Sequence, residues 1–338
     1  MKTTKIISAC AVLAALASCS NDHELFQQSA EDTPIRIQAN VGGITTRAGS
    51  NIQSQFFEAN EKIGIFLKEH LESVQTNVAT YENPIEGTVN NSIQTNIDLA
   101  SPQYFPANGR SVDCLAIYPK QFNSVNIDNN TNSFSVEEDQ STDANYKKSD
   151  LMYAYTANTA KGDAINLTFT HLLSKIIVEV KADVSVNKDV LSDVYVDLCN
   201  TNKTIDITVD DIEQGYQSAD KSVTVGGNAS APATIVMGKP GVNALDATKT
   251  NEVAAIIVPQ TIDNTNTFIQ VRLNNGTENY ATYNYIPSAA QTFAGSKSYK
   301  YTITLKAGGI SITNVEITDW IDDTSSLPGG GEGDAILQ

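Results

Sequence analysis

Several kinds of residue are scarce in this sequence, and each scarcity argues against a class of function. The 338 residues include only three histidines, four cysteines and one tryptophan, which leaves few side chains for a metal site. Basic residues are also few: 22 lysines and arginines stand against 39 aspartates and glutamates, a formal net charge of −17. A nucleic-acid-binding surface needs clustered cations, and so does electrostatic docking on an anionic membrane. The composition therefore argues against both.

The overall composition is that of a folded protein, and no group of residues stands out as a reaction centre. Hydrophobic residues make up 41% and charged residues 18% of the chain, which excludes a disordered acidic polymer. At roughly 150 residues per domain, the length predicts about two domains. No arrangement of residues indicates catalysis, so we predict a protein that is not an enzyme, with no catalytic residues, no cofactor and no metal.

The start of the chain has the pattern of an export signal. Lys2 and Lys5 precede an apolar stretch, 6–17, that is too short to span a bilayer. The stretch ends in Leu-Ala-Ser-Cys, which resembles a bacterial lipobox and predicts cleavage before Cys19, with acyl chains attached to that cysteine. The acidic run at 20–24 resembles the export tag of lipoproteins on the outer face of the outer membrane. We therefore expect a surface-exposed outer-membrane lipoprotein, with a signal peptide at 1–18 and an acidic tether at 19–33.

Two thiols are expected in the mature chain. Cys10 leaves with the signal and Cys19 is lipidated, so Cys114 and Cys199 remain. A disulfide between them would close a long loop and contribute about 4 kcal/mol in the chain-entropy model. Because each lies in a strand-like apolar pattern, we favour two buried free thiols and leave the pairing open.

The dominant pattern along the chain is a period of two, which indicates half-buried β-strands. It is clear at the start of the mature chain, where Ile35, Ile37, Ala39 and Val41 alternate with polar residues. The periodicity of a three-turn helix is not evident anywhere, although 183–191 fits one short turn. Further strands are expected at 62–67, 111–118, 165–171, 176–180, 194–198, 205–209, 253–258, 268–273 and 299–305.

This arrangement predicts an all-β fold. Many short strands separated by clusters of Asn, Asp, Gly, Ser and Thr favour antiparallel β-sandwiches, and two of them in tandem fit the length. We place the first sandwich at 34–172, the second at 173–321, and a flexible glycine-rich tail at 322–338.

Two local patterns suggest chemistry but have simpler explanations. His171 shares a strand face with Leu167 and Phe169, so we interpret it as a core or domain-junction histidine bonded to backbone. Residues 128–139 carry Asp and Asn at EF-hand spacing, but Ser133 replaces the required glycine and the last position is Asp rather than Glu. We interpret this stretch as a polar turn and not as a calcium site.

A series of short motifs lies between about residues 60 and 320. They are EKIGIF at 61–66, YFP at 104–106, VDCLAIYP at 112–119, SDLMYA at 149–154, LTFTHLLSKI at 167–176, FAG at 293–295, YKYTITL at 299–305 and ITDW at 317–320. In order and spacing they resemble the fimbrillin family, the lipoprotein-derived pilus subunits of Gram-negative gut and oral anaerobes. Cys114 departs from the family, which usually has an aromatic or aliphatic residue there. The resemblance implies two transthyretin-like β-sandwiches and a role in adhesive surface fibres, in which other fimbrillin subunits are the partners of a homo- or heteropolymer.

The loop after the first strand predicts how such a fibre would assemble. The bond between Arg47 and Ala48 lies in a turn-like stretch of small residues, which favours proteolysis. Fimbrillins that this chain resembles are matured by cleavage after an arginine here, which implies an arginine-specific protease as a partner. Cleavage would remove the first strand, within 34–47, together with the lipid anchor. The groove vacated by Ile35, Ile37, Ala39 and Val41 would accept a strand from another subunit, as in donor-strand complementation.

The end of the sequence is a poor donor strand. After Trp320 the apolar residues are Leu327 and the short run 335–337, without the alternation that a groove requires. This favours a tip or anchor subunit, which accepts a strand but donates none, over a stalk subunit. The choice among stalk, tip and anchor stays open, as does the host or bacterial surface ligand.

An alternative function is a surface glycan-binding lipoprotein of a polysaccharide-uptake system. That function would require exposed aromatic pairs on one face, whereas the single tryptophan, Trp320, is more simply interpreted as a plug at the end of a sandwich. Neighbouring genes discriminate the two, because other fimbrillin-like lipoproteins favour the pilus and a porin–lipoprotein pair favours glycan uptake.

The lipid anchor gives a first prediction. Cys19→Ala is expected to abolish labelling by a palmitate analogue and to move the protein out of the membrane fraction, because the acylated residue is lost. Cys10→Ala, which changes the other N-terminal cysteine, should label normally. Unchanged labelling and fractionation of the Cys19→Ala protein would rule the anchor out.

Overall fold

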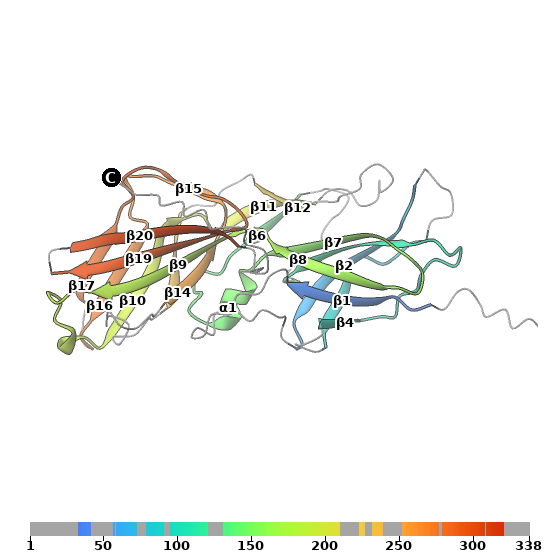
Figure 1. Cartoon of the computed structure of the whole chain (residues 1–338), viewed down its shortest axis with the longest axis horizontal. Helices are drawn as coiled ribbons and strands as arrows, with labels where there is room; N and C mark the ends of the chain where they lie inside the picture. Colours follow the sequence, from blue (N-terminus) through green and yellow to red (C-terminus); the bar gives the residue numbers. More distant parts are fainter. Residues whose placement is uncertain are drawn as a thin grey trace, which may run out of the picture.

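The chain folds almost wholly into β-strands, arranged as an elongated molecule (Figure 1). The computed structural model describes residues 33–41, 57, 59–72, 79–90, 95–120, 131–209, 223–226, 232–238, 252–276, 279–307 and 309–320. Within these ranges, helical structure is limited to α1 (Asp143–Lys148) and the short 3-10 helix η2 (Lys188–Val190). The predicted all-β class is confirmed.

One half of the molecule is a closed barrel. Its neighbouring strands are antiparallel, except that β1 and β8 run in the same direction. The sandwich predicted for 34–172 thus has its sheets joined edge to edge into one ring. The order around the ring is β1 (Arg36–Val41), β4 (Thr95–Leu99), β3 (Ile85–Val89), β2 (Lys62–Glu69), β5 (Val112–Tyr118), β7 (Met152–Thr159) and β8 (Ala164–His171).

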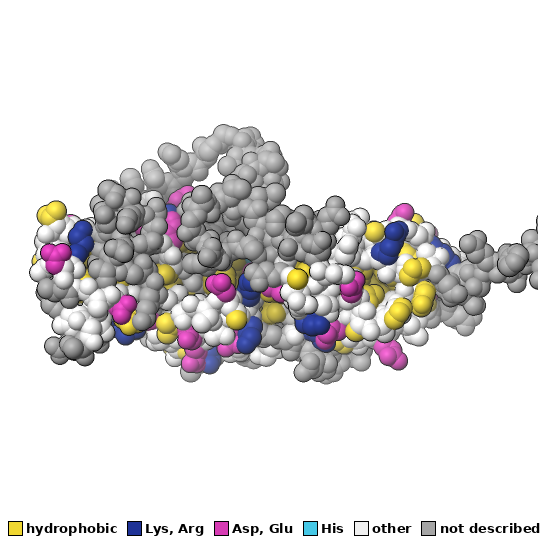
Figure 2. Space-filling model, turned by 90° about the horizontal axis from the view of Figure 1, so that it is seen from below, with side chains coloured by type: hydrophobic (Ala, Val, Ile, Leu, Met, Phe, Trp, Pro, Cys, Tyr) yellow, Lys and Arg dark blue, Asp and Glu magenta, His cyan; other side chains and the backbone are white. Residues whose placement is uncertain are grey.

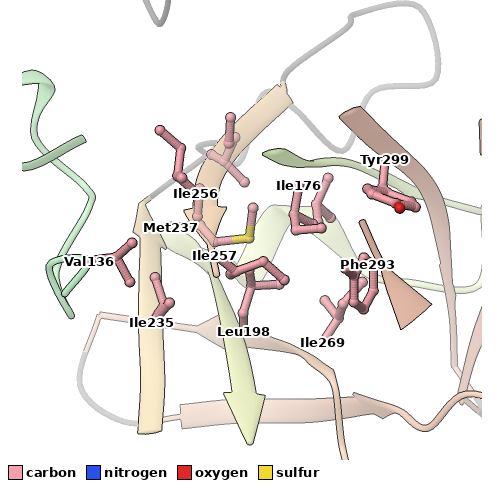
Figure 3. Packing of buried hydrophobic residues seen from close by; sticks show 14 of the residues in the cluster. Val136, Ile176, Leu198, Ile235, Met237, Ile256, Ile257, Ile269, Phe293 and Tyr299 are labelled. Atoms are coloured by element: carbon pink, nitrogen blue, oxygen red, sulfur yellow. The ribbon is translucent and has the colours of Figure 1, made fainter. Parts of the chain in front are cut away.

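The other half is built from two four-stranded sheets that face each other across a hydrophobic core. Figure 3 shows Ile176, Leu198 and Ile269 converging between the sheets, and all three are fully buried. The first sheet has the order β14 (Glu252–Ile257), β9 (Ser174–Ala182), β19 (Lys297–Lys306), β20 (Gly309–Asp319), and the second β13 (Ala233–Gly238), β10 (Asp193–Thr201), β16 (Ile269–Asn274), β17 (Asn279–Tyr285). A small pair, β15 (Gln260–Ile262) and β18 (Gln291–Phe293), completes it.

The two halves are joined by more than the chain passing from β8 to β9. Strand β6 (Thr131–Ser135) pairs with β11 (Thr204–Val209), which also pairs with β12 (Val223–Gly226). The side chain of Gln140 then bonds to the backbone of Ile256 of β14, with its Nε2 donating to the carbonyl and its Oε1 accepting from the amide, each at 2.8 Å. The chain between β5 and β7 therefore visits the second half before it returns to the barrel.

A shared core lies at this junction. Phe66 of β2 and Leu115 of β5 point out of the barrel and belong to the same cluster as Phe134, Val136 and Tyr146. Both strands are consequently buried on both faces, which explains why their sequences read as continuous apolar runs instead of alternating.

The predicted strands are all present, with ends shifted by a few residues, and η2 falls within the predicted turn at 183–191. The strands that sequence reasoning missed are short or polar, such as β3, β4, β12 and β17, or lie at an edge, such as β20. Helix α1 was missed because it has only six residues, which is too short for a helical period.

Cys114 and Cys199 are both free thiols. Cys114 is fully buried inside the barrel, and this burial, with the nearby charge of Asp113, raises its pKa. Cys199 is only partly buried, because its position on β10 does not face the core. Among the residues described, no helix is both long and apolar enough to cross a membrane.

The junction gives a second prediction. A Cβ atom added to Gly295 would lie 2.5 Å from the carbonyl oxygen of Leu172, which is backbone and cannot rotate away. Gly295→Ala is therefore expected to lower the free energy of unfolding by about 1–3 kcal/mol, measured by chemical denaturation. Gly226 is the control, since a Cβ there meets nothing within 4 Å, and Gly226→Ala should change stability by less than about 0.5 kcal/mol. If the two substitutions lowered the free energy of unfolding equally, the predicted clash between a Cβ atom at Gly295 and the Leu172 carbonyl would be wrong.

Candidate strand-exchange groove

Strand β1 has one buried and one exposed face, as its sequence predicts. Ile35, Ile37 and Ala39 are 7%, 2% and 0% exposed and belong to the barrel core, whereas Arg36 and Gln38 are exposed. Val41 ends the strand in register with Phe169 of β8. Fully burying an isoleucine side chain contributes about 1.5–3 kcal/mol. The segment therefore contributes several kcal/mol to the barrel.

The backbone of β1 closes the ring between two strands that are distant in sequence. It is in register with β8 along its whole length, but with β4 only from Ile37 to Ala39. On its other side, β8 is in register with β7 only at Thr170 and His171. From Ala164 to Phe169, β8 is therefore in register with β1 and with no other strand of the described sheet. Without β1, both β4 and β8 would become open edges.

Beneath β1 lies a row of large apolar side chains. Ile165, Leu167 and Phe169 of β8 and Ile97 of β4 are buried in the same core as the apolar face of β1. The ring of Phe57 packs edge-on against that of Phe169, with 5.0 Å between the centroids. Phe57 follows Arg47 in the sequence, so it would remain after cleavage there. A barrel that lost β1 would expose an apolar trough lined by these residues.

The beginning of β1 is clamped to the segment around residue 104. Ile35 N donates to Gln103 O at 2.8 Å, and Phe105 N donates to Thr33 O at 3.0 Å. The YFP motif at 104–106 therefore holds the first strand in place, a role that its sequence does not reveal.

The chain just after the clamping segment is held by one buried carboxylate, that of Glu69. Asn108 Nδ2 and Arg110 Nη1 donate to Glu69 Oε1 at 2.9 and 2.6 Å, and Ala79 N donates to Oε2 at 2.6 Å. Burial by itself would raise the pKa of Glu69, but these hydrogen bonds outweigh it and hold the pKa below its ordinary value. The Glu69 carboxylate is therefore kept in its ionised form, in which it accepts all three hydrogen bonds.

The seam between β1 and β4 is incomplete. A hollow of about 630 Å³ lies where the two strands diverge, lined by apolar residues such as Pro34, Ile35 and Leu99 and by polar ones such as Gln103. Figure 2 views the molecule from the side where these strands lie in Figure 1, and it shows apolar side chains gathered toward the barrel end. This seam is where β1 has the fewest backbone partners.

β1 is also topologically simple to remove. A parallel pair cannot be joined by a hairpin, so β1 meets β8 through backbone hydrogen bonds and side-chain packing and not through a direct turn. Cys19, Arg47 and Ala48 lie outside the described residues. A cut at Arg47 would leave β1 bound to the rest without a covalent link.

His171 lies at the junction, where the sequence predicts it. Its Nδ1 is 2.7 Å from Asp150 Oδ1, and its ring stacks on that of Trp320 with 3.9 Å between centroids. Its carbonyl accepts from Ser296 Oγ at 2.5 Å. The prediction of a junction histidine is thus met, although the partner of its Nδ1 is a carboxylate, where the sequence analysis expected backbone.

The EF-hand-like spacing is not realised as one loop in the described part of the chain. Asn132 lies on β6, in register with Ile207 of β11, and Asp139 forms an isolated bridge with Val236. Asp128 and Asn130 lie outside the described residues. In the described ranges, no three His, Cys, Asp or Glu residues group as metal ligands would.

The fold and the groove define an all-β protein whose first strand closes a barrel. The sequence model of the fimbrillin-like family matches residues 46–320, and the chain belongs to that family. The matched region begins after β1, one residue before Arg47. Among curated proteins, no sequence matches this chain.

Two crystal structures show a similar fold. One is a candidate cell adhesion protein from Bacteroides uniformis, with 21% identity and a TM-score of 0.59, covering 86% of this chain and 100% of that one. The other is a candidate cell adhesion protein from Bacteroides ovatus, with 16% identity and a TM-score of 0.60, covering 85% and 98%.

The groove gives a third prediction. Ile37→Ala should lower the free energy of unfolding of the uncleaved protein by about 2–4 kcal/mol, because it leaves a cavity between β4 and β8. Gln38→Ala, on the exposed face of the same strand, should change it by less than about 0.5 kcal/mol. Denaturant titration measures both. If the two substitutions cost the same, β1 does not close the core.

Proposed function

We propose that this protein is a structural and adhesive subunit of a cell-surface fimbria. Membership of the fimbrillin-like family supports this function, and the placement of β1 supports its mechanism. The single observation that carries the proposal is that a strand with a fully buried apolar face closes the barrel without any hairpin to its parallel neighbour. As a building block the protein would act without catalysis or a cofactor.

The proposed mechanism begins with export. The chain is anchored in the outer membrane through acylated Cys19, and β1 fills its own groove, so that the monomer is stable and does not polymerise. An arginine-specific protease then cuts between Arg47 and Ala48. The lipid anchor and β1 are released together, because β1 precedes the cut.

Assembly follows from the vacated groove. The open edges of β4 and β8 present unpaired backbone groups, and the trough between them exposes the apolar side chains that β1 had covered. A strand from another fimbrillin subunit satisfies both at once, since its backbone completes the ladders and its alternate side chains fill the pockets. Short-range contacts of this kind are required, because subunits with a large negative charge repel one another at a distance.

The position in the fibre is proposed from the C-terminal sequence. The segment 321–338, outside the described residues, contains many glycines and lacks a bulky alternating stretch. This composition suits a tip or anchor subunit, which accepts a strand without having to donate one, better than a stalk subunit.

Arg47→Ala gives the fourth prediction and tests the mechanism. Treatment of the wild-type protein with an arginine-specific protease is expected to yield a fragment that begins at Ala48 and keeps both halves folded. Arg47→Ala should block this cut and fibre entry, whereas Arg36→Ala, which changes an arginine held in β1 by a 2.8 Å bond to Gly162 O, should leave both intact. The cleaved protein should bind a synthetic 33–41 peptide, and a peptide with Asp in place of Ile37 should bind at least tenfold more weakly.

Two results would contradict the mechanism. One is normal fibre entry of the Arg47→Ala protein with residues 20–47 retained. The other is a cleaved protein that binds both peptides equally, because the groove would then not read the apolar face of the strand.

A further inference from the structure

The buried face of β1 is uneven in size. Ile35 and Ile37 have large side chains, whereas Ala39, the next residue on the same face, has only a methyl group. Ala39 is nevertheless 0% exposed and belongs to the same barrel core as the two isoleucines. The groove that β1 fills therefore has two large sites followed by a small one.

Large residues surround the small site. Ala39 is in register with Leu167 of β8, which is also 0% exposed. Phe169, the next residue on that face of β8, packs edge-on against Phe57, and Phe57 packs in the same way against Tyr118, with ring centroids 5.0 and 5.1 Å apart. Because protein interiors are close-packed, a wholly buried alanine among such neighbours has little space beyond its methyl group.

The other end of the groove has additional space. The hollow of about 630 Å³ at the seam between β1 and β4 is lined, among the described residues, by Ile35 and Ile37 but not by Ala39. Leu99 and Pro102 give this hollow an apolar wall. A side chain larger than isoleucine at the start of the strand can therefore extend into the hollow, next to apolar surface.

A change of register produces the hollow. β1 pairs with Ile97 through Ile37, but the preceding bridge joins Pro34 to Tyr104. Two residues of the first strand thus lie opposite six residues of the other side, 98–103. The six cannot all contact the strand, so the chain between the two pairings leaves a gap. The difference between the two ends of the groove is consequently built into its strand pairing.

We propose that the groove selects its donor strand by the size of one side chain, at the Ala39 site. The inference rests on the strand exchange proposed above and specifies the partner. The donor is an extended segment of another subunit in which Ala or Gly follows two large apolar residues at alternate positions. Because β1 runs parallel to β8, this order is read in one direction, with the small residue toward the C-terminal end.

The selection follows from packing and not from hydrophobicity. Additional carbon atoms at the Ala39 site have no free volume to enter, so they displace neighbours or force strained rotamers. The same atoms at the Ile35 site enter the hollow and cover apolar surface. A strand with large apolar residues at every alternate position is therefore a poorer donor than β1, although it is more hydrophobic.

The test compares two peptides with equal added bulk. In a synthetic 33–41 peptide, Ala39→Leu and Ile35→Phe add the same number of carbon atoms. The full-length protein in detergent is cut with an arginine-specific protease, the protease is inhibited, and each peptide competes with a fluorescent wild-type 33–41 peptide. Ile35→Phe should compete within about threefold of the wild-type peptide, whereas Ala39→Leu should be at least about tenfold weaker.

An isomeric peptide separates position from composition. Exchanging the residues at two sites, as Ile37→Ala with Ala39→Ile, keeps the charge and the composition of the peptide. It should compete at least about tenfold more weakly than the wild-type sequence, because it has a large residue at the small site and a small residue at a large one.

A compensating change in the protein then locates the site. Leu167→Ala enlarges the space beside position 39 and should reduce the discrimination against the Ala39→Leu peptide at least about threefold. Ile165→Ala is the control, since Ile165 is equally buried on the same strand but is in register with Ile37. It should leave that discrimination within about twofold. Should Leu167→Ala not fold, as judged by circular dichroism, Leu167→Val replaces it, with a reduction of about twofold expected.

The uncleaved protein tests the small site without strand exchange. Ala39→Leu in the full-length chain should lower the melting temperature by about 3 °C or more, because the strand no longer fits its own groove. Ile35→Phe, which adds the same bulk beside the hollow, should shift the melting temperature by less than about 1 °C.

Four outcomes would overturn the inference. They are equal competition by the Ala39→Leu and Ile35→Phe peptides, equal competition by the isomeric and wild-type peptides, equal discrimination by the Leu167→Ala and Ile165→Ala proteins, and equal melting temperatures of the two uncleaved variants. If the wild-type peptide binds but size has no effect, strand exchange stands and only the size selection is wrong. If the wild-type peptide does not bind the cleaved protein, strand exchange itself is wrong, and the inference fails with it.

Discussion

The barrel depends on one interaction, the insertion of β1 between β4 and β8. A closed barrel has no open strand edges, and each strand in it satisfies the backbone of two neighbours. β1 does this without a hairpin to β8, and with only a short register to β4. The apolar face of β1 also packs in the barrel core with Ile165, Leu167 and Phe169 of β8. Removing this one strand would therefore break hydrogen bonding and packing at the same place.

The second half of the molecule does not rely on β1. Its two sheets are completed by their own strands, and the junction is closed by β6, α1 and a core shared with Phe66 and Leu115. His171 and Trp320 lie at this junction, immediately beyond the end of the groove, because Phe169 is in register with the last residue of β1. The strand that closes the barrel and the junction between the two halves are thus built from different residues.

The junction also collects charge that is dispersed in the sequence. The lysines of β2, of α1 and of the chain after β5 come together only because α1 is brought back against the end of the barrel.

Much of the molecule was determined by the sequence alone, and the reason is local. The alternation of Ile35, Ile37 and Ala39 predicts a strand with one buried face, and the structure has that strand. The continuous apolar runs of β2 and β5 also predict strands, although the sequence cannot say that their second face is covered by the other half. What only the tertiary structure decided depends on distant partners. The closure of the barrel by a parallel neighbour, the clamp between residues 33–35 and 103–105 and the passage of β6 to the second half are all pairings between remote segments. Periodicity records whether a residue is buried, but it does not record which distant residue it meets.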